Sequence, residues 1–237
     1  VVPNTVTKTL HTDKVYEPDL NSFTIEPFPY YSPLKSQIET IKSFDRPVIL
    51  VDDLVHTANR LQVLVPQFRE DGIPIKKVVV GVLSGYGRDL MQCLKVPGES
   101  IYSMPNLRQW FVESTLYPFI GGDTVRREEM KVAGLQPSIN MILPYATPRL
   151  SGCSREALVE FSACCIENSR DLFQVLEAEY RKMYAKNLTL SRLSEAVILP
   201  LCPDKGSCME YDENLAASVY LENDLETLWR MKEFLIK

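Results

Sequence analysis

The strongest feature of the chain is a pair of short apolar runs separated by a stretch with helical spacing. The runs are Val48–Val51 and Val78–Leu83, and between them Leu61, Val65 and Phe68 recur every three or four positions. A short continuous apolar run is typical of a strand buried on both faces of a sheet, and the intervening spacing predicts a helix. Strand, helix and strand in this order predict a right-handed βαβ unit with parallel strands.

Weaker patterns predict further elements on both sides of this unit. Residues 1–23 are polar and interrupted by proline, which favours a loop or an extended arm. Ser32-Pro33 is a typical helix start, because serine caps a helix and proline fits its first turn. The other expected elements are a short strand at Thr24–Glu26, a helix continuing to about Phe44, a helix at Arg88–Leu94, one or two strands within 98–120 and a strand at Ile139–Leu143.

After Pro148 the pattern changes to long helical stripes. Ser154 is a suitable cap for a helix of roughly 30 residues, and a second helix begins at about Asn214. The first stripe consists of Leu158, Phe161, Cys165, Leu172, Leu176, Tyr180 and Met183. The second consists of Leu221, Leu225, Leu228 and Leu235. Both stripes predict amphipathic helices that pack on the rest of the protein or on a partner.

These elements predict an α/β protein with a parallel, doubly wound sheet and a C-terminal helical appendage. We expect residues 1–47 to form an N-terminal arm and a helix that joins the core. Residues 48–150 are expected to form the α/β core, and residues 151–237 a helical C-terminal region.

Composition narrows the classes of protein that remain. The chain has 237 residues, with 45% hydrophobic and 24% charged residues, which is ordinary for a globular protein. The net charge of −5 disfavours nucleic acid as a partner, and no apolar run is long enough to span a membrane. The chain does not begin with methionine, so we expect an upstream domain in a longer chain as one partner. A second copy of the chain, forming a homodimer, is the other partner that we expect.

The cysteines do not predict a disulfide scaffold. There are six of them, at positions 93, 153, 164, 165, 202 and 208, which is too few and too scattered for such a scaffold in a chain of this size. Cys202 and Cys208 have a spacing that loosely fits a zinc clip, but the chain has only two histidines and no second cysteine pair, so we favour free thiols. This cysteine usage predicts a cytoplasmic protein.

Glycine is scarce in the part of the chain that carries the first candidate site. The sequence has 16 prolines and 10 glycines, and the first glycine is Gly72. Residues before Gly72 therefore contain no glycine-rich loop of the kind that wraps phosphate with backbone amides.

The segment from Val48 to Arg60 carries the clearest candidate chemistry. We expect Asp52 and Asp53 to end the first apolar strand, at the sheet edge where ligands of parallel α/β proteins bind. Two carboxylates there can bind vicinal hydroxyls or a hydrated metal ion. The next helix begins near Thr57, and its free N–H groups favour a phosphate, with Arg60 as an additional cation. Carboxylates that bind vicinal hydroxyls, next to a helix start that binds a phosphate, indicate a ribose 5-phosphate ligand.

This segment resembles the signature of the type I phosphoribosyltransferases, which bind phosphoribosyl pyrophosphate (PRPP). That signature has four apolar strand residues, two acidic residues, two apolar residues and a short threonine-containing loop that leads into a helix. Val48–Val51, Asp52-Asp53, Leu54-Val55 and Thr57 occupy these positions, and Asp71-Gly72-Ile73 with the following valine-rich strand continues the likeness. The resemblance covers about residues 45 to 90.

The resemblance implies a phosphoribosyltransferase-like fold and a role for each residue of the motif. Asp52 and Asp53 are implied to bind the ribose hydroxyls during catalysis and to contact Mg²⁺ indirectly, as the metal that accompanies PRPP. The loop residues His56, Thr57, Ala58, Asn59 and Arg60 are implied to bind the 5′-phosphate.

The sequence departs from the family pattern at two places that matter for transfer. Ala58 stands where the family usually has glycine. The upstream pyrophosphate loop should lie before residue 45, but the loop within Thr24–Phe44 has neither glycine nor a basic residue.

A second group of candidate residues follows the second apolar run. Ser84-Gly85-Tyr86-Gly87 is expected to form a turn at the carboxyl end of that strand, so Ser84, Tyr86 and Arg88 should face the same cleft as Asp52. In that position Tyr86 could stack on a base and Arg88 could bind an anion. The stretch around Trp110 is expected to belong to the core.

Three classes of function fit these observations. The chain is either an active phosphoribosyltransferase that transfers the phosphoribosyl group to a base, or a non-catalytic regulatory domain that binds PRPP or a nucleotide. A receiver-like signalling domain is the third class, because an apolar strand followed by two aspartates also begins those proteins. A receiver needs a phospho-accepting aspartate at the end of a later strand, and the next strand here is expected to end in Leu83-Ser84-Gly85.

Overall fold

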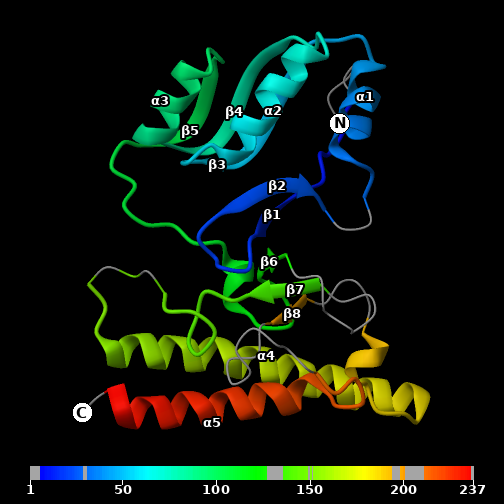
Figure 1. The fold of residues 1–237 in the computed structure, drawn as a ribbon, viewed down its shortest axis with the longest axis vertical. Helices are drawn as coiled ribbons and strands as arrows, with labels where there is room; N and C mark the ends of the chain where they lie inside the picture. The colour runs from blue at the N-terminus through cyan, green and yellow to red at the C-terminus, as the bar shows by residue number, and fades with distance from the viewer. Residues whose placement is uncertain are drawn as a thin grey trace. The chain divides into compact units, whose positions relative to one another are not determined.

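The protein consists of two compact units, which a computed structural model describes for residues 6–28, 31–126, 136–148, 150, 152–193, 198–200 and 211–235. The first unit comprises Val1–Lys14 and Thr24–Trp110, and the second comprises Val15–Phe23 and Phe111–Lys237. Figure 1 shows the elements of both units with their labels. Each unit is built from two separate segments of the chain.

The first unit contains a parallel sheet with the order β3-β4-β5. Its strands are β3 (Val48–Val55), β4 (Ile75–Ser84) and β5 (Gly98–Met104), and each neighbouring pair is parallel. Helix α2 (Asn59–Glu70) joins β3 to β4, and α3 (Gly85–Cys93) joins β4 to β5. The expected βαβ unit and the α/β class are therefore confirmed, and one strand is found where one or two were expected within 98–120.

Both connecting helices of this sheet pack on the same face. Val78 and Val80 of β4 share a buried cluster with Leu61 and Val65 of α2 and with Met91 of α3. This arrangement follows from the strand order, because two successive right-handed crossovers in the same direction place their helices on one side of the sheet. A doubly wound sheet, by contrast, has helices on both sides.

The opposite face of the sheet is open, so the expectation that the apolar runs are buried on both faces is wrong. Val51 is 77% exposed and Ile101 is 75% exposed, while Ile49 is 48% exposed. An apolar run predicts a strand but does not predict how many layers cover it.

The N-terminal part of the first unit packs against α2. Helix α1 (Leu34–Lys42) buries Leu34, Ile38 and Ile41 against Leu64 and Phe68. The expected strand at Thr24–Glu26 is confirmed as β2 (Phe23–Pro27). The expected arm over residues 1–23 is only partly correct, because it contains strand β1 (Thr12–Tyr16).

The second sheet has the order β2-β1-β6-β7-β8. Strands β6 (Asp123–Val125), β7 (Gln136–Ile139) and β8 (Ile198–Pro200) are short, and they form a mixed sheet. β1 pairs in parallel with β6, and Glu17 and Arg126 form an ion pair next to this contact. A short 3₁₀ helix, η1 (Glu113–Leu116), precedes β6, and another, η2 (Leu190–Arg192), precedes β8.

The strand expected at Ile139–Leu143 is wrong, because β7 ends where that run begins. Asn140 donates from its side chain to the carbonyl oxygens of Thr115 and Gly121, and Leu143 donates its N–H to the Ser162 hydroxyl. Ile142 and Leu143 are buried in the core of the second unit. The apolar run is therefore explained by core packing of a turn.

Two long helices complete the second unit, α4 (Arg155–Tyr184) and α5 (Ala217–Leu235). The Ser154 hydroxyl caps α4 by accepting from the N–H of Ala157, as expected. The helices lie side by side and antiparallel (Figure 1), since the early residue Glu160 pairs with the late Lys232, and Glu177 contacts Ser218 at the other end. Both helices share one core with Leu116, Phe119 and Ile142 of the preceding segment.

The stripe expected to bury α4 is only partly correct. Cys165 is buried, but Leu172, Leu176 and Met183 are exposed. The buried face of α4 consists of Val159, Ser162, Ala163, Cys165, Ile166, Ser169 and Phe173. On α5 the expected residues Leu221, Leu225 and Leu228 are buried, and the side chain of Leu235 lies outside the described residues.

Among the described residues, no helix has the length and apolar character needed to cross a bilayer. The segment with Cys202 and Cys208 lies outside the described residues, so its chemistry remains a prediction.

Candidate functional site

The acidic pair lies within strand β3, so the expectation that it ends the strand is wrong. β3 continues through Asp52 and Asp53 to Val55 because its backbone stays paired with β4, with Asp52 opposite Val80 and Leu54 opposite Val82. The pair nevertheless lies in the carboxyl-terminal half of the strand, shortly before the loop that leads into α2.

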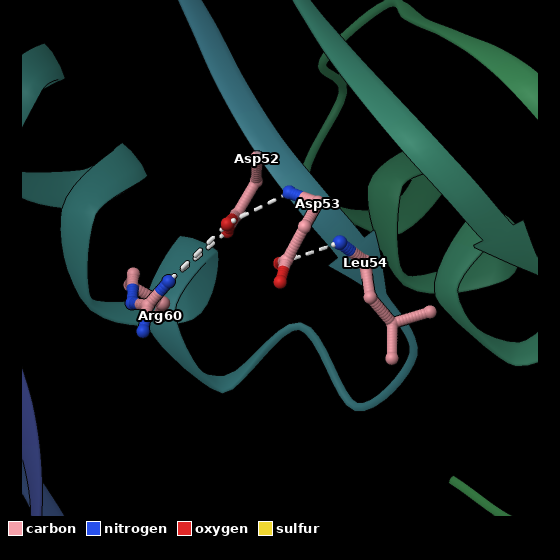
Figure 2. A network of polar contacts seen from close by, with 4 residues as sticks. All are labelled: Asp52, Asp53, Leu54 and Arg60. Atoms are coloured by element: carbon pink, nitrogen blue, oxygen red, sulfur yellow. Dashed lines mark hydrogen bonds and ion pairs between the residues drawn. The ribbon is translucent and has the colours of Figure 1, made fainter. Parts of the chain in front are cut away.

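Asp52 forms an ion pair with Arg60 across that loop. The Arg60 Nη1 atom lies 3.3 Å from the Asp52 Oδ2 atom, and Figure 2 shows the Asp52 side chain directed toward the guanidinium. Burial raises the pKa of Asp52 above its usual value; the cation of Arg60 opposes this shift, and the neighbouring Asp53 carboxylate adds to it. Arg60 therefore already has an anionic partner inside the protein.

Asp53 is the more accessible carboxylate of the pair. Its residue is exposed, and its Oδ1 atom accepts a hydrogen bond of 2.7 Å from the N–H of Leu54. In Figure 2 its carboxylate lies beside that of Asp52, near the loop into α2. A carboxylate oxygen has several acceptor positions, so Asp53 can also accept from hydroxyl groups of a ligand.

The loop reaches α2 through a residue with left-handed backbone. Ala58 has φ 52° and ψ 22°, the region that glycine adopts at least cost, and its methyl group is buried beside Leu61 and Val65. The family resemblance places glycine at this position, and the backbone of Ala58 has the conformation that explains that preference. The loop therefore keeps its shape without glycine, at the expense of some strain.

No side chain caps the N-terminus of α2. The Thr57 hydroxyl accepts from Asn59, and the Thr57 carbonyl accepts from the side chain of Gln62, so these groups stabilise the loop itself. The first N–H groups of α2 are therefore not satisfied by a cap, and such groups attract an anion.

His56 and Ser84 connect the ends of two neighbouring strands. His56 Nδ1 and Ser84 Oγ form a hydrogen bond of 2.8 Å, and the same oxygen accepts from the N–H of Gly87 at 2.9 Å. The expected turn at Ser84–Gly87 is wrong, because α3 already begins at Gly85 and Ser84 is its N-cap. A Cβ atom on Gly87 would lie 2.3 Å from the Val55 carbonyl oxygen, so glycine here lets α3 approach β3 closely.

Two further aromatic rings lie next to His56. Its ring centroid is 5.9 Å from that of Tyr86 and 6.5 Å from that of Trp110. The structure thus brings Ser84 and Tyr86 together with His56, whereas Arg88 is an exposed residue of the first turns of α3. Trp110 was expected in the core and is 44% exposed. Trp110 follows β5, the third strand of the sheet, by six positions.

The described residues do not form a metal site by themselves. Among them, no group of three or more His, Cys, Asp or Glu side chains is arranged to hold an ion. Mg²⁺ prefers six oxygen ligands, and the carboxylates described at this loop are those of Asp52 and Asp53, with Asp52 paired with Arg60. The donor set of the protein alone does not fit the ion.

The segment expected to hold the pyrophosphate loop differs from that of the resembling family. β2, the strand before α1, belongs to the five-stranded sheet and not to β3-β4-β5. The Gln37 side chain accepts from the N–H of His11 at 2.8 Å and donates to the Ser32 carbonyl at 2.7 Å. His11 also stacks on Tyr31, with ring centroids 3.9 Å apart. These contacts occupy the described residues around the start of α1 with internal bonds.

Comparison with known proteins identifies no relative: no family model, no curated protein and no solved structure matches the chain.

Proposed function

We propose that the first unit binds the ribose 5-phosphate part of a small ligand, either PRPP or a nucleotide, at the loop between β3 and α2. The observation that carries this proposal is the uncapped N-terminus of α2, which follows a left-handed Ala58 and lies close in sequence to the exposed Asp53. A phosphate fits the free N–H groups, and a carboxylate nearby fits the hydroxyls of a ribose.

Each backbone group and side chain of the proposed site has a distinct role. The backbone N–H groups of Asn59 and Arg60 bind the 5′-phosphate, helped by the helix dipole. Asp53 accepts from a ribose hydroxyl. Asp52 holds Arg60 at 3.3 Å beside the phosphate position, so the arginine contributes positive charge while it stays attached to β3.

Binding without transfer is the form of the function that the geometry favours. The described residues around the start of α1 bind one another, and the sequence before residue 45 offers no glycine for a loop that wraps pyrophosphate. Phosphoribosyl transfer to a base, with Mg²⁺ brought by the phosphates of PRPP, is the second candidate. A receiver-like signalling domain is not favoured, because it needs a phospho-accepting aspartate at the end of a later strand. Here β4 ends at Ser84 and β5 ends at Met104.

The proposal is tested by calorimetric titration of the protein with ribose 5-phosphate and with PRPP, in the presence and absence of Mg²⁺. We expect saturable binding and a weakening on the order of ten-fold in Asp53→Asn, because a hydrogen bond to a charged group contributes about 1.5–3 kcal/mol. Glu70→Gln is the matched control, since it removes one exposed carboxylate at the other end of α2.

Binding that is absent for both ligands would contradict the proposal, as would equal loss of affinity in Asp53→Asn and Glu70→Gln. Transfer is measured separately, as release of pyrophosphate from PRPP in the presence of Mg²⁺ and a panel of nucleobases. Release that depends on Asp53 would replace the binding role by catalysis.

A further inference from the structure

Three aromatic side chains converge at one end of the sheet of the first unit. His56 follows β3, Tyr86 lies in the first turn of α3 after β4, and Trp110 lies beyond the end of β5. All three positions follow the carboxyl ends of neighbouring parallel strands, and the rings of Tyr86 and Trp110 each lie next to that of His56. We define His56, Tyr86 and Trp110 as the aromatic platform.

The rings of Tyr86 and Trp110 both meet the His56 ring at steep angles. His56 meets Tyr86 at an interplanar angle of 60° and Trp110 at 78°, so both contacts are edge contacts. Tyr86 remains 57% exposed and Trp110 44% exposed. Large exposed rings are suited to a planar partner that stacks on them.

The His56 ring of the platform is held in place by a hydrogen bond. Ser84 is 1% exposed, and its hydroxyl bonds both the His56 ring and the N–H of Gly87. The absence of a side chain on Gly87 lets the start of α3 lie close to the Val55 carbonyl oxygen. A His56 ring that is held before binding loses little conformational entropy when a ligand stacks beside it.

We infer that the ligand of the first unit carries an aromatic base, which stacks on Tyr86 or Trp110 beside His56, so that the ligand class is a nucleoside 5′-monophosphate and not a bare phosphorylated sugar. This inference rests on the proposed function, because His56 directly precedes the loop residues that bind the phosphate. The platform adds what the phosphate loop lacks, exposed aromatic rings on which a base can stack.

The test compares the dissociation constants of ribose 5-phosphate, AMP and UMP for the wild-type protein and for Trp110→Ala and Tyr86→Ala. We expect the two nucleotides to bind on the order of ten-fold more tightly than ribose 5-phosphate, as base stacking on an aromatic side chain typically gives. At least one of the two alanine variants should lose this difference while its affinity for ribose 5-phosphate stays the same.

The outcomes separate this inference from the proposed function. If ribose 5-phosphate and the nucleotides all fail to bind, the proposed function is wrong and the inference falls with it. If ribose 5-phosphate binds as tightly as AMP and UMP, only the inference is overturned. Equal weakening of all three ligands in both alanine variants also overturns it, because the rings would then only support the loop.

A spectroscopic measurement covers the case in which the alanine variants do not fold. The chain has two tryptophans, and Trp229 belongs to the second unit. In a Trp229→Phe background, AMP should change the fluorescence of Trp110 with a midpoint equal to its dissociation constant, and ribose 5-phosphate should cause no change at saturation. The same change with both ligands would overturn the inference.

Discussion

The Nδ1 atom of His56 lies 2.8 Å from the Oγ atom of Ser84, so one hydrogen bond joins the carboxyl ends of β3 and β4. Ser84 is at the same time the N-cap of α3. The orientation of the His56 ring is thus coupled to the start of the helix that carries Tyr86.

Replacing Ser84 by alanine should affect both ends of this bond. We expect Ser84→Ala to destabilise the protein by about 1 kcal/mol in chemical denaturation, because an N-cap is lost. The imidazole ¹⁵N signals of His56 should shift, and those of His11, the other histidine of the chain, serve as the internal control. Unchanged His56 signals would contradict the coupling.

Gly87→Ala should destabilise the protein although alanine favours helices. A Cβ atom at this position would lie 2.3 Å from the backbone oxygen of Val55, so the start of α3 must move away from β3. We expect a loss of about 1–3 kcal/mol in urea denaturation. Asp89→Ala on the exposed side of the same helix is the control and should remain within about 0.5 kcal/mol of wild type. A stability gain in Gly87→Ala would show that the close approach is absent.

Ala185 ends α4 with left-handed backbone, at φ 53°, and its side chain is exposed. Glycine adopts this conformation without the clash of a Cβ atom, so Ala185→Gly should raise the free energy of unfolding by about 0.5–1 kcal/mol. The same substitution at the exposed mid-helix residue Ala178 should lower it by about 1 kcal/mol. Denaturation curves of the two variants should therefore shift in opposite directions, and shifts in the same direction would contradict the assignment.

Asp52 should make the stability of the protein depend on pH with a defined sign. Burial raises its pKa above the ordinary value of 3.8, so the folded state binds the proton more tightly than the unfolded state. Proton binding by Asp52 therefore adds to the free energy of unfolding. This contribution is complete below pH 3.8 and is lost as the pH rises through the raised pKa of Asp52. The stability of Asp52→Asn relative to wild type should therefore increase between about pH 3 and pH 7, as measured by urea denaturation.

Asp53→Asn gives a second check on the same group. The Asp53 carboxylate contributes to raising the pKa of Asp52. Removing the Asp53 charge should therefore lower the pH range over which the contribution of Asp52 to stability is lost. A relative stability of Asp52→Asn that decreases with pH would mean that the attraction of Arg60 outweighs burial.

The sequence predicts the elements of the first unit well because their signals are local. The apolar run at Val48–Val51 and the spacing of Leu61, Val65 and Phe68 identify β3 and α2, and the order of elements identifies a parallel sheet. The extension of β3 through Asp52 and Asp53 could not be predicted, since it depends on pairing with β4 and not on the strand's own composition.

The second unit was harder to predict because its decisive contacts are distant in sequence. Both sides of α4 carry apolar residues, so the choice between the face of Leu172 and that of Ile166 depends on where α5 packs. In the candidate site, the proximity of His56 and Ser84 follows from parallel strand ends. The exposure of Trp110 required knowing where β5 ends.

The pairing of β1 with β6 has a consequence for the order in which the protein can fold during synthesis. Glu17 and Arg126, which flank this contact, are 109 positions apart in the chain. At about 5–20 residues per second, β1 leaves the ribosome on the order of 5–20 seconds before its partner strand. The parallel sheet of the first unit, whose strands β3, β4 and β5 follow one another closely, can assemble during that interval. The edge of β1 that pairs with β6 therefore has to wait for its partner strand while this sheet folds.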